Sequence, residues 1–270
     1  MINRRVTRTI YDTLETTDVT NSLTSTPLTF ALLTTSSFYV GFHGHFAARY
    51  FNMNVVNVVS SVLTVEYWNG SAWTPVDDLL DQTSLAGATF GQSGFVSWSN
   101  KTDWVKRSLT GIDSDVELYW VRMQVSVNLT AGCKLQSVLN LFSDNAILKA
   151  YYPELVSDTR YLPSGQTNFL PQHIAAKDLI VLRCKQRKLI TDESQIIDIN
   201  SVAIAAAHAT AWIILSPIAN TEAKAEMADA ADKKFMKEIE QLLLDVDANS
   251  DGVVTEAERR ALSQPFISRR

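Results

Sequence analysis

The fold class follows from the stretch Leu63-Thr-Val65-Glu-Tyr67-Trp68-Asn69-Gly70-Ser-Ala-Trp73-Thr-Pro75. Its first six residues alternate between apolar and polar side chains, as a half-buried β-strand does. Asn69-Gly70 is a dipeptide that favours tight turns between antiparallel strands. The stretch therefore predicts a β-hairpin.

The residues around this hairpin have the same character. Five of the six tryptophans lie in the first 148 residues, where short segments rich in β-branched and aromatic residues are separated by glycine-containing turns. This pattern predicts an antiparallel β-sandwich or jelly roll over residues 37–148. Residues 1–36 are rich in Thr and Ser, and we expect an N-terminal arm or irregular segment with one strand.

The second half of the chain has a helical pattern. Tyr151-Tyr-Pro153 and Leu162-Pro163-Ser-Gly165 predict a linker over residues 149–170. Apolar residues at helical spacing then predict an α-helical bundle over residues 171–246, with helices over 172–188, 195–215 and 222–245. The alanine-rich second helix would let a neighbouring helix approach closely. The predicted class is α+β, with an N-terminal sandwich followed by a C-terminal bundle.

Composition excludes several classes of protein. The chain has 270 residues, a net charge of −5 and 20% charged residues, so no global basic field favours nucleic acid. Two cysteines, Cys133 and Cys184, do not make a disulfide framework, and we expect reduced, buried thiols. The apolar run 202–214 is too short, and too interrupted by His208, for us to expect a membrane span. Arginines cluster at both ends; we expect solvated tails, with contact to DNA or a partner as the alternative.

The most specific motif for a bound ion lies in the C-terminal segment 247–270. Residues 247–258 have the spacing of an EF-hand calcium loop, with Gly252 at position 6 for the sharp turn. The predicted Ca²⁺ ligands are Asp247, Asn249, Asp251, the Val253 carbonyl, Thr255 and Glu258. The alternative is a solvated acidic turn. Because the loop is unpaired, a structural calcium site is favoured over a calcium sensor.

Other candidate residues have a structural interpretation beside the functional one. His43 and His45 would need a third ligand to hold a metal, so strand or turn residues are favoured. His173 and His208 lie on predicted helices, where packing is favoured over catalysis. Trp68 and Trp73 could stack on sugars, but aromatic packing in the sandwich core is favoured. Because no serine, cysteine or carboxylate pair has a catalytic context, we do not expect an enzyme.

Two parts of the sequence resemble proteins of tailed phages. The string from Glu66-Tyr-Trp-Asn-Gly-Ser-Ala-Trp73 through Phe90-Gly-Gln-Ser-Gly94 and Trp98 to Tyr119-Trp120-Val-Arg122 resembles a β-sandwich module of phage virion proteins, over residues 37–142. Pro171-Gln-His-Ile, the alanine-rich helix 201–215 and the acidic helix 222–244 are similar to helical head–tail adaptor proteins. The large sandwich and the calcium loop depart from a minimal adaptor.

The resemblance implies a structural virion protein, assembled in a host cytoplasm and located in the virion. Its expected partners are further copies in a homo-oligomeric ring, the portal protein and tail or neck proteins, with no membrane. Two other classes stay open. A carbohydrate-binding decoration or receptor module would need Trp68 or Trp73 exposed, and a calcium-regulated binding protein would change conformation with Ca²⁺.

Overall fold

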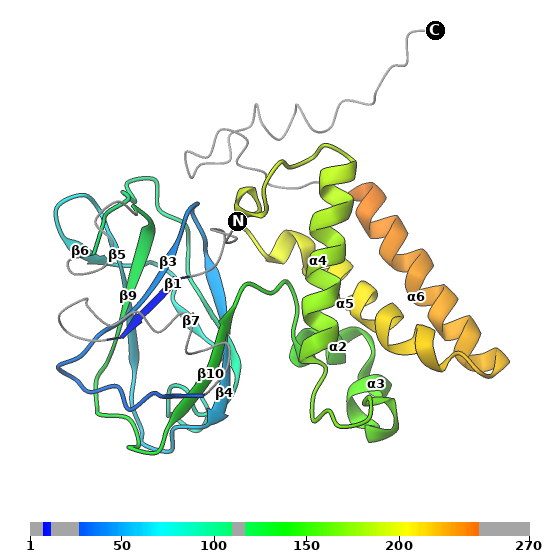
Figure 1. The fold of residues 1–270 in the computed structure, drawn as a ribbon, viewed down its shortest axis with the longest axis horizontal. Coiled ribbons are helices and arrows are strands. Elements are labelled where there is room, and N and C mark those ends of the chain that lie inside the picture. The colour runs from blue at the N-terminus through cyan, green and yellow to red at the C-terminus, as the bar shows by residue number, and fades with distance from the viewer. Residues whose placement is uncertain (1–7, 12–26, 110–116, 243–270) are drawn as a thin grey trace, which may run out of the picture. The chain divides into compact units, whose positions relative to one another are not determined.

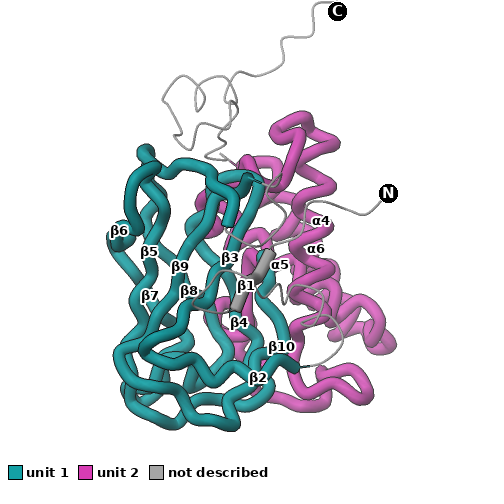
Figure 2. Tube along the Cα trace, turned by 60° about the vertical axis from the view of Figure 1, so that its left-hand side comes forward, with its two compact units in different colours: residues 1–140, 249–253 teal, residues 141–248, 254–270 magenta. Residues whose placement is uncertain are grey.

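The computed structural model describes residues 8–11, 27–109 and 117–242. In the described part, two five-stranded antiparallel sheets are followed by helices (Figure 1). This is the predicted α+β class. The chain divides into two compact units between Asn140 and Leu141, which Figure 2 colours separately.

The sheets have different strand orders. The first is β1-β3-β9-β5-β6, with bounds Arg8–Tyr11, Phe38–Phe42, Tyr119–Val125, Leu63–Trp68 and Trp73–Pro75. The second is β2-β10-β4-β8-β7, with bounds Leu28–Thr29, Lys134–Leu139, Ala48–Val55, Gly94–Ser97 and Leu80–Asp81. β1 and β2 both fall within the segment 1–36 that the sequence assigned to an arm.

The β5–β6 hairpin forms as predicted, with Trp68 opposite Trp73. Gly70 in the connecting turn has φ of 96°, which glycine adopts without strain. The Asn69 side-chain oxygen accepts hydrogen bonds from the backbone N–H groups of Ser71 and Ala72, at 2.9 and 2.8 Å. The local chemistry of Asn-Gly therefore sets the position of the hairpin.

Alternation places one face of each sheet in the sandwich core. Leu63, Val65 and Tyr67 of β5 join a large buried cluster to which strands of both sheets contribute. The opposite face of the first sheet carries a smaller cluster around Tyr39 and Trp120. A Cβ at Gly41 would lie 2.5 Å from the Trp120 ring, so only glycine leaves room for this indole on the neighbouring strand.

Up to residue 242, where the described part of the chain ends, the second unit contains three long helices and two short ones. Their bounds are α2 Asn145–Tyr151, α3 Pro153–Ser157, α4 Leu170–Gln186, α5 Asn200–Leu215 and α6 Glu222–Gln241, with 3₁₀ turns η1 Thr159–Tyr161, η2 Glu193–Gln195 and η3 Ser216–Ile218. The structure has the end of α2, α3 and η1 where the sequence predicted a linker, and Tyr152, Leu155 and Phe169 of this region are buried in a core. The predicted linker is thus part of the helical unit's packing.

The alanines of α5 are buried within the chain itself. Ala205, Ala206 and Ala209 are at most 1% exposed, and α5 packs against α4, α6 and α2. α5 with η3 covers 19 residues and, by length and composition alone, could cross a membrane, contrary to the expectation that this run is too short. Burial as the central helix of the unit explains its apolar composition equally well.

α6 begins at the predicted residue but ends earlier than predicted. Its last residue is Gln241, and Leu242 has extended backbone angles. The Arg187 guanidinium, just after α4, donates hydrogen bonds to the carbonyl oxygens of Ile239 and Glu240. These carbonyl groups lie in the last turn of α6, where carbonyl oxygens have no N–H partner within the helix. Arg187 therefore caps the C-terminal end of α6.

The hydrophobic clusters respect the boundary between the units. Every buried residue of the two sandwich clusters precedes Asn140, and every buried residue of the two helical clusters follows it. Each unit therefore has a core of its own.

Candidate interaction surface

Four loop segments lie at one end of the sandwich. β4 and β9 end there, and β3, β5, β8 and β10 begin there, as the antiparallel registers require. The segments are residues 30–37, 54–62, 82–93 and 126–133, and we call them the apolar loop end.

The apolar loop end contains no Asp, Glu, Lys or Arg, although 20% of the whole chain is charged. Twelve large apolar side chains are exposed among the described residues, and seven of them lie on this end: Leu33, Val55, Val56, Val58, Val62, Leu85 and Val127. Val58 is 76% exposed and Val62 68%, the highest values of the twelve. Exposed apolar groups gathered in one place are typical of interaction sites.

One buried side chain connects three of these segments. Asn57 is 2% exposed, and its amide nitrogen donates to the carbonyl oxygens of Val59 and Thr89, at 2.8 and 2.9 Å. Its side-chain oxygen accepts from the backbone N–H and the hydroxyl of Thr130, both at 3.0 Å. A buried amide with its donors and acceptors satisfied holds the surrounding backbone in one arrangement.

Further hydrogen bonds complete the loop end. Thr34 N–H donates to the Asn128 side chain at 2.8 Å, which connects the first segment to the last. Val62 N–H donates to the Ser126 hydroxyl at 2.9 Å. The backbone that carries the exposed valines is therefore held in place by hydrogen bonds between the four segments.

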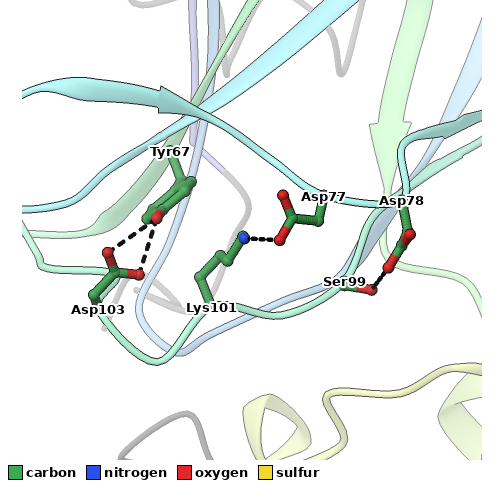
Figure 3. A network of polar contacts seen from close by, with 6 residues as sticks. All are labelled: Tyr67, Asp77, Asp78, Ser99, Lys101 and Asp103. Carbon is green, nitrogen blue, oxygen red and sulfur yellow. Dashed lines mark hydrogen bonds and ion pairs between the residues drawn. The ribbon is translucent and has the colours of Figure 1, made fainter.

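The opposite end of the sandwich carries charged residues. Figure 3 shows the Tyr67 hydroxyl donating to both carboxylate oxygens of Asp103, at 2.9 and 3.0 Å, and Lys101 paired with Asp77. Burial, together with the hydrogen bond to Asp103, raises the pKa of Tyr67 to about 12. The phenol thus stays protonated and fastens the loop after β8 to β5, a structural role.

Trp68 and Trp73 lie together on the outer face of the first sheet, where each is partly exposed. Their ring centroids are 5.6 Å apart, and the Arg107 guanidinium lies 4.3 Å from the Trp68 centroid and 5.2 Å from that of Trp73. Arg122 lies 5.1 Å from the Trp73 centroid and pairs with Glu66. Trp73 packs against the buried cluster around Tyr39 and Trp120, so the packing interpretation holds for this ring on the outer face of the sheet and not between the two sheets. Because neither tryptophan is fully buried, sugar binding stays an untested alternative.

His43 and His45 do not form a metal site with other described residues. His45 is buried, stacks on Trp104 at 5.6 Å and contacts the Tyr119 ring at 4.0 Å. In the described ranges, no group of three His, Cys, Asp or Glu side chains could hold a metal ion. The packing interpretation accounts for His45.

A buried polar cluster in the helical unit was not predicted. His173 Nδ1 lies 2.8 Å from the Ser143 hydroxyl, and Nε2 lies 3.1 Å from the Asn145 side-chain oxygen. Burial lowers the pKa of His173 to about 3, so the ring is neutral, with Nε2 donating to Asn145 and Nδ1 accepting from Ser143. Ser143 is fully buried and His173 is 2% exposed, so this cluster holds α4 near the start of α2 from within the packed unit.

His208 and the thiols are also packed. The Tyr152 hydroxyl lies 2.8 Å from His208 Nδ1, and burial, with a smaller contribution from Lys234, lowers the pKa of His208. Cys133 and Cys184 are buried and free, as expected, and burial raises the pKa of each thiol to about 11. Neither thiol is activated as a nucleophile.

The predicted calcium ligands, residues 247–258, lie outside the described residues, as do the terminal arginine clusters. The calcium site therefore stays a sequence prediction. The apolar loop end is the surface that sequence reasoning missed. The sequence does show that these residues lack charged side chains, but they belong to four separate segments that only the fold brings together.

Comparisons of the chain with protein-family models, with curated proteins and with solved structures found no match.

Proposed function

We propose that this chain is a non-enzymatic structural protein of a tailed-phage virion, located at the head–tail junction, where it joins the portal to tail or neck proteins. The resemblance of two sequence regions to phage proteins motivates the virion assignment. The apolar loop end carries the assembly role, because it is a fixed, exposed and uncharged surface suited to binding another protein.

The form of this surface favours binding over chemistry. Val58 and Val62 offer apolar area and no reactive group. The side-chain amide of Asn57 is buried, and its hydrogen bonds go to other residues of the loops, so it is not available to a partner. An assembly subunit needs such a surface, because permanent contacts between subunits are more apolar than transient ones.

The packing of α5 changes how a ring would form. The sequence predicted that its alanines would let a neighbouring helix approach closely, and in the structure that neighbour is supplied by α4 and α6 of the same chain. Side-to-side contacts in a ring would have to use other surfaces. Exposed Leu182 of α4 and Ile204 of α5 are candidates in the helical unit.

The proposal is tested on purified particles of the phage that encodes the chain. Mass spectrometry should detect the chain in intact virions, and a cryo-EM map should contain its sandwich and helices at the junction between portal and tail. Absence from the virion, or density only on the tail fibres, would reject the assignment.

A further inference from the structure

We propose that acidification releases residues 143–157 from α4 and α5 while the rest of the helical unit stays folded. These residues contain α2 and α3, and we call them the α2–α3 segment. The release is a local opening of one part of a folded protein. Because it depends only on contacts within one chain, it is independent of any position in a virion.

Two histidines on different helices hold the two ends of α2. At its start, His173 of α4 has Nδ1 2.8 Å from the Ser143 hydroxyl and Nε2 3.1 Å from the Asn145 side-chain oxygen. At its end, His208 of α5 has Nδ1 2.8 Å from the Tyr152 hydroxyl. The two histidines are 2% and 6% exposed, so both contacts are made inside the unit, away from water.

These contacts are almost all of the polar attachment of the α2–α3 segment. Among the described residues, every side-chain hydrogen bond between the segment and another helix involves His173, His208 or the hydroxyl of Thr210, which lies 3.4 Å from the Ser143 hydroxyl. Loss of both histidine contacts would therefore leave the segment held mainly by apolar packing.

The apolar packing of the segment is limited. Its buried apolar side chains are Leu148, Tyr152 and Leu155, which share a core with α5 and α6. The larger cluster between α4, α5 and α6 contains no residue of the segment, so it is kept when the segment leaves. Release would uncover the face of α5 that carries Ile214 and Leu215.

Protonation of either ring is incompatible with these contacts. Nδ1 of His173 accepts the hydroxyl proton of Ser143. Burial raises the pKa of Tyr152 to about 12, so the phenol keeps its proton and can donate it to His208 in the same way. A protonated imidazole carries a proton on both nitrogens and accepts no hydrogen bond. A charged ring would also be desolvated in the packed unit.

The direction of the response follows from the two states. Burial lowers the pKa of His173 to about 3, and burial also lowers the pKa of His208. In the released state each ring is exposed to water and has a pKa of about 6.5. The released state therefore binds protons first, and release becomes more favourable as the pH falls below about 6.5.

Charged groups around the rings modify this response. Lys234 of α6 lowers the pKa of His208 further, whereas Glu238 of α6 raises it. Burial alone lowers the pKa of His173. Asp144 lies between the two residues that bond His173, and burial raises the pKa of its carboxyl group. Asp144 therefore opposes release at acid pH, because it binds a proton more tightly in the packed state.

Hydrogen–deuterium exchange of the full chain, measured by mass spectrometry between pH 7 and pH 5, tests the proposal. After correction for the intrinsic exchange rate, residues 145–157 should lose protection about 25-fold through His173 alone, because its pKa is about 3 when packed and about 6.5 when released. His208 should increase this factor. The amides of α6 and β9 should change much less.

Variants separate the two histidines. His208→Gln should keep the response of about 25-fold, whereas His173→Gln should lose it and keep only the part due to His208. His43→Gln removes a histidine from the sandwich and should behave like the unchanged chain.

The measurement on the unchanged chain does not depend on any variant being folded. If residues 145–157 and α6 lose protection equally, the unit opens as a whole and the proposal is wrong. It is also wrong if protection of the segment does not depend on pH, or if the three variants respond alike. None of these outcomes changes where the chain is found in a virion.

Discussion

At the scale of single residues, the buried amide of Asn57 determines the arrangement of the candidate surface, because it joins three of its four loop segments by hydrogen bonds. Its neighbours in sequence suggest an ordinary turn asparagine. Its partners Thr89 and Thr130 are 32 and 73 residues away, so no local pattern could have identified them. The exposure of the valines and the contacts of Asn57 both depend on segments that are distant in the sequence, so neither could be predicted from it.

Replacing Asn57 tests this role. Asn57→Ala should lower the free energy of unfolding by about 2–4 kcal/mol, because it leaves buried partners without hydrogen bonds. The exposed Asn128, which bonds only Thr34 N–H among the contacts described, provides the control, and Asn128→Ala should cost less than about 1 kcal/mol. Urea unfolding followed by tryptophan fluorescence measures both. Equal losses would contradict the account of Asn57 as the central residue.

At the scale of elements, sequence reasoning succeeded where the determinants are local. The β5–β6 hairpin follows from alternation and an Asn-Gly turn, and the starts of α4 and α6 lie within two residues of their predicted positions. It failed where an element's partner is distant. The alanines of α5 predicted a closely packed helix correctly, but they could not say that α4 and α6 of the same chain would supply the contact.

The buried histidine that links α4 to the start of α2 gives a prediction for pH. The pKa of His173 is near 3 in the folded state and about 6.5 when unfolded, so the unfolded state binds the proton first. Stability from this group is complete above pH 6.5 and falls by up to about 1.4 kcal/mol per pH unit between pH 6.5 and pH 3. The measurement is urea unfolding of the full chain between pH 3 and pH 7, with the helical signal in circular dichroism reporting on the helical unit.

The control for this prediction is His173→Gln, which keeps a polar side chain and cannot be protonated there. It should be less stable at pH 7 but show a shallower loss on acidification. The difference between the two pH profiles isolates His173 from the carboxylates, which titrate in the same range. Parallel profiles for the two proteins would show that His173 is not the group responsible.

At the scale of the whole molecule, the class and order of the two units could be predicted, but the boundary could not. The change in residue pattern near residue 150 is a change of composition, whereas the structure divides the chain between Asn140 and Leu141. Tyr151 and Pro153, which suggested a linker, lie in α2 and α3, and both Tyr152 between these helices and Leu155 of α3 are buried. Proline at the first position of a helix is compatible with helix formation, so it was a poor marker of a linker.

The calcium loop is tested on the complete chain. Ca²⁺ should bind with one site per chain in isothermal titration calorimetry and should raise the unfolding temperature relative to a sample with chelator. Glu258→Gln should abolish both effects, because it removes a bidentate carboxylate ligand. Glu256→Gln, at a loop position that supplies no ligand, should preserve them. A wild-type chain with neither binding heat nor a shift would remove calcium from the account.

The described chain leaves the core of the sandwich once and then forms the core of the helical unit. This arrangement has an evolutionary consequence. Because no buried cluster draws residues from both sides of the peptide between Asn140 and Leu141, a crossover between genes at that point would exchange a complete sandwich and leave the helices packed as before. The sandwich, together with its apolar loop end, could then be replaced as one unit. A lineage could exchange the sandwich in this way without changing the buried clusters of the helices.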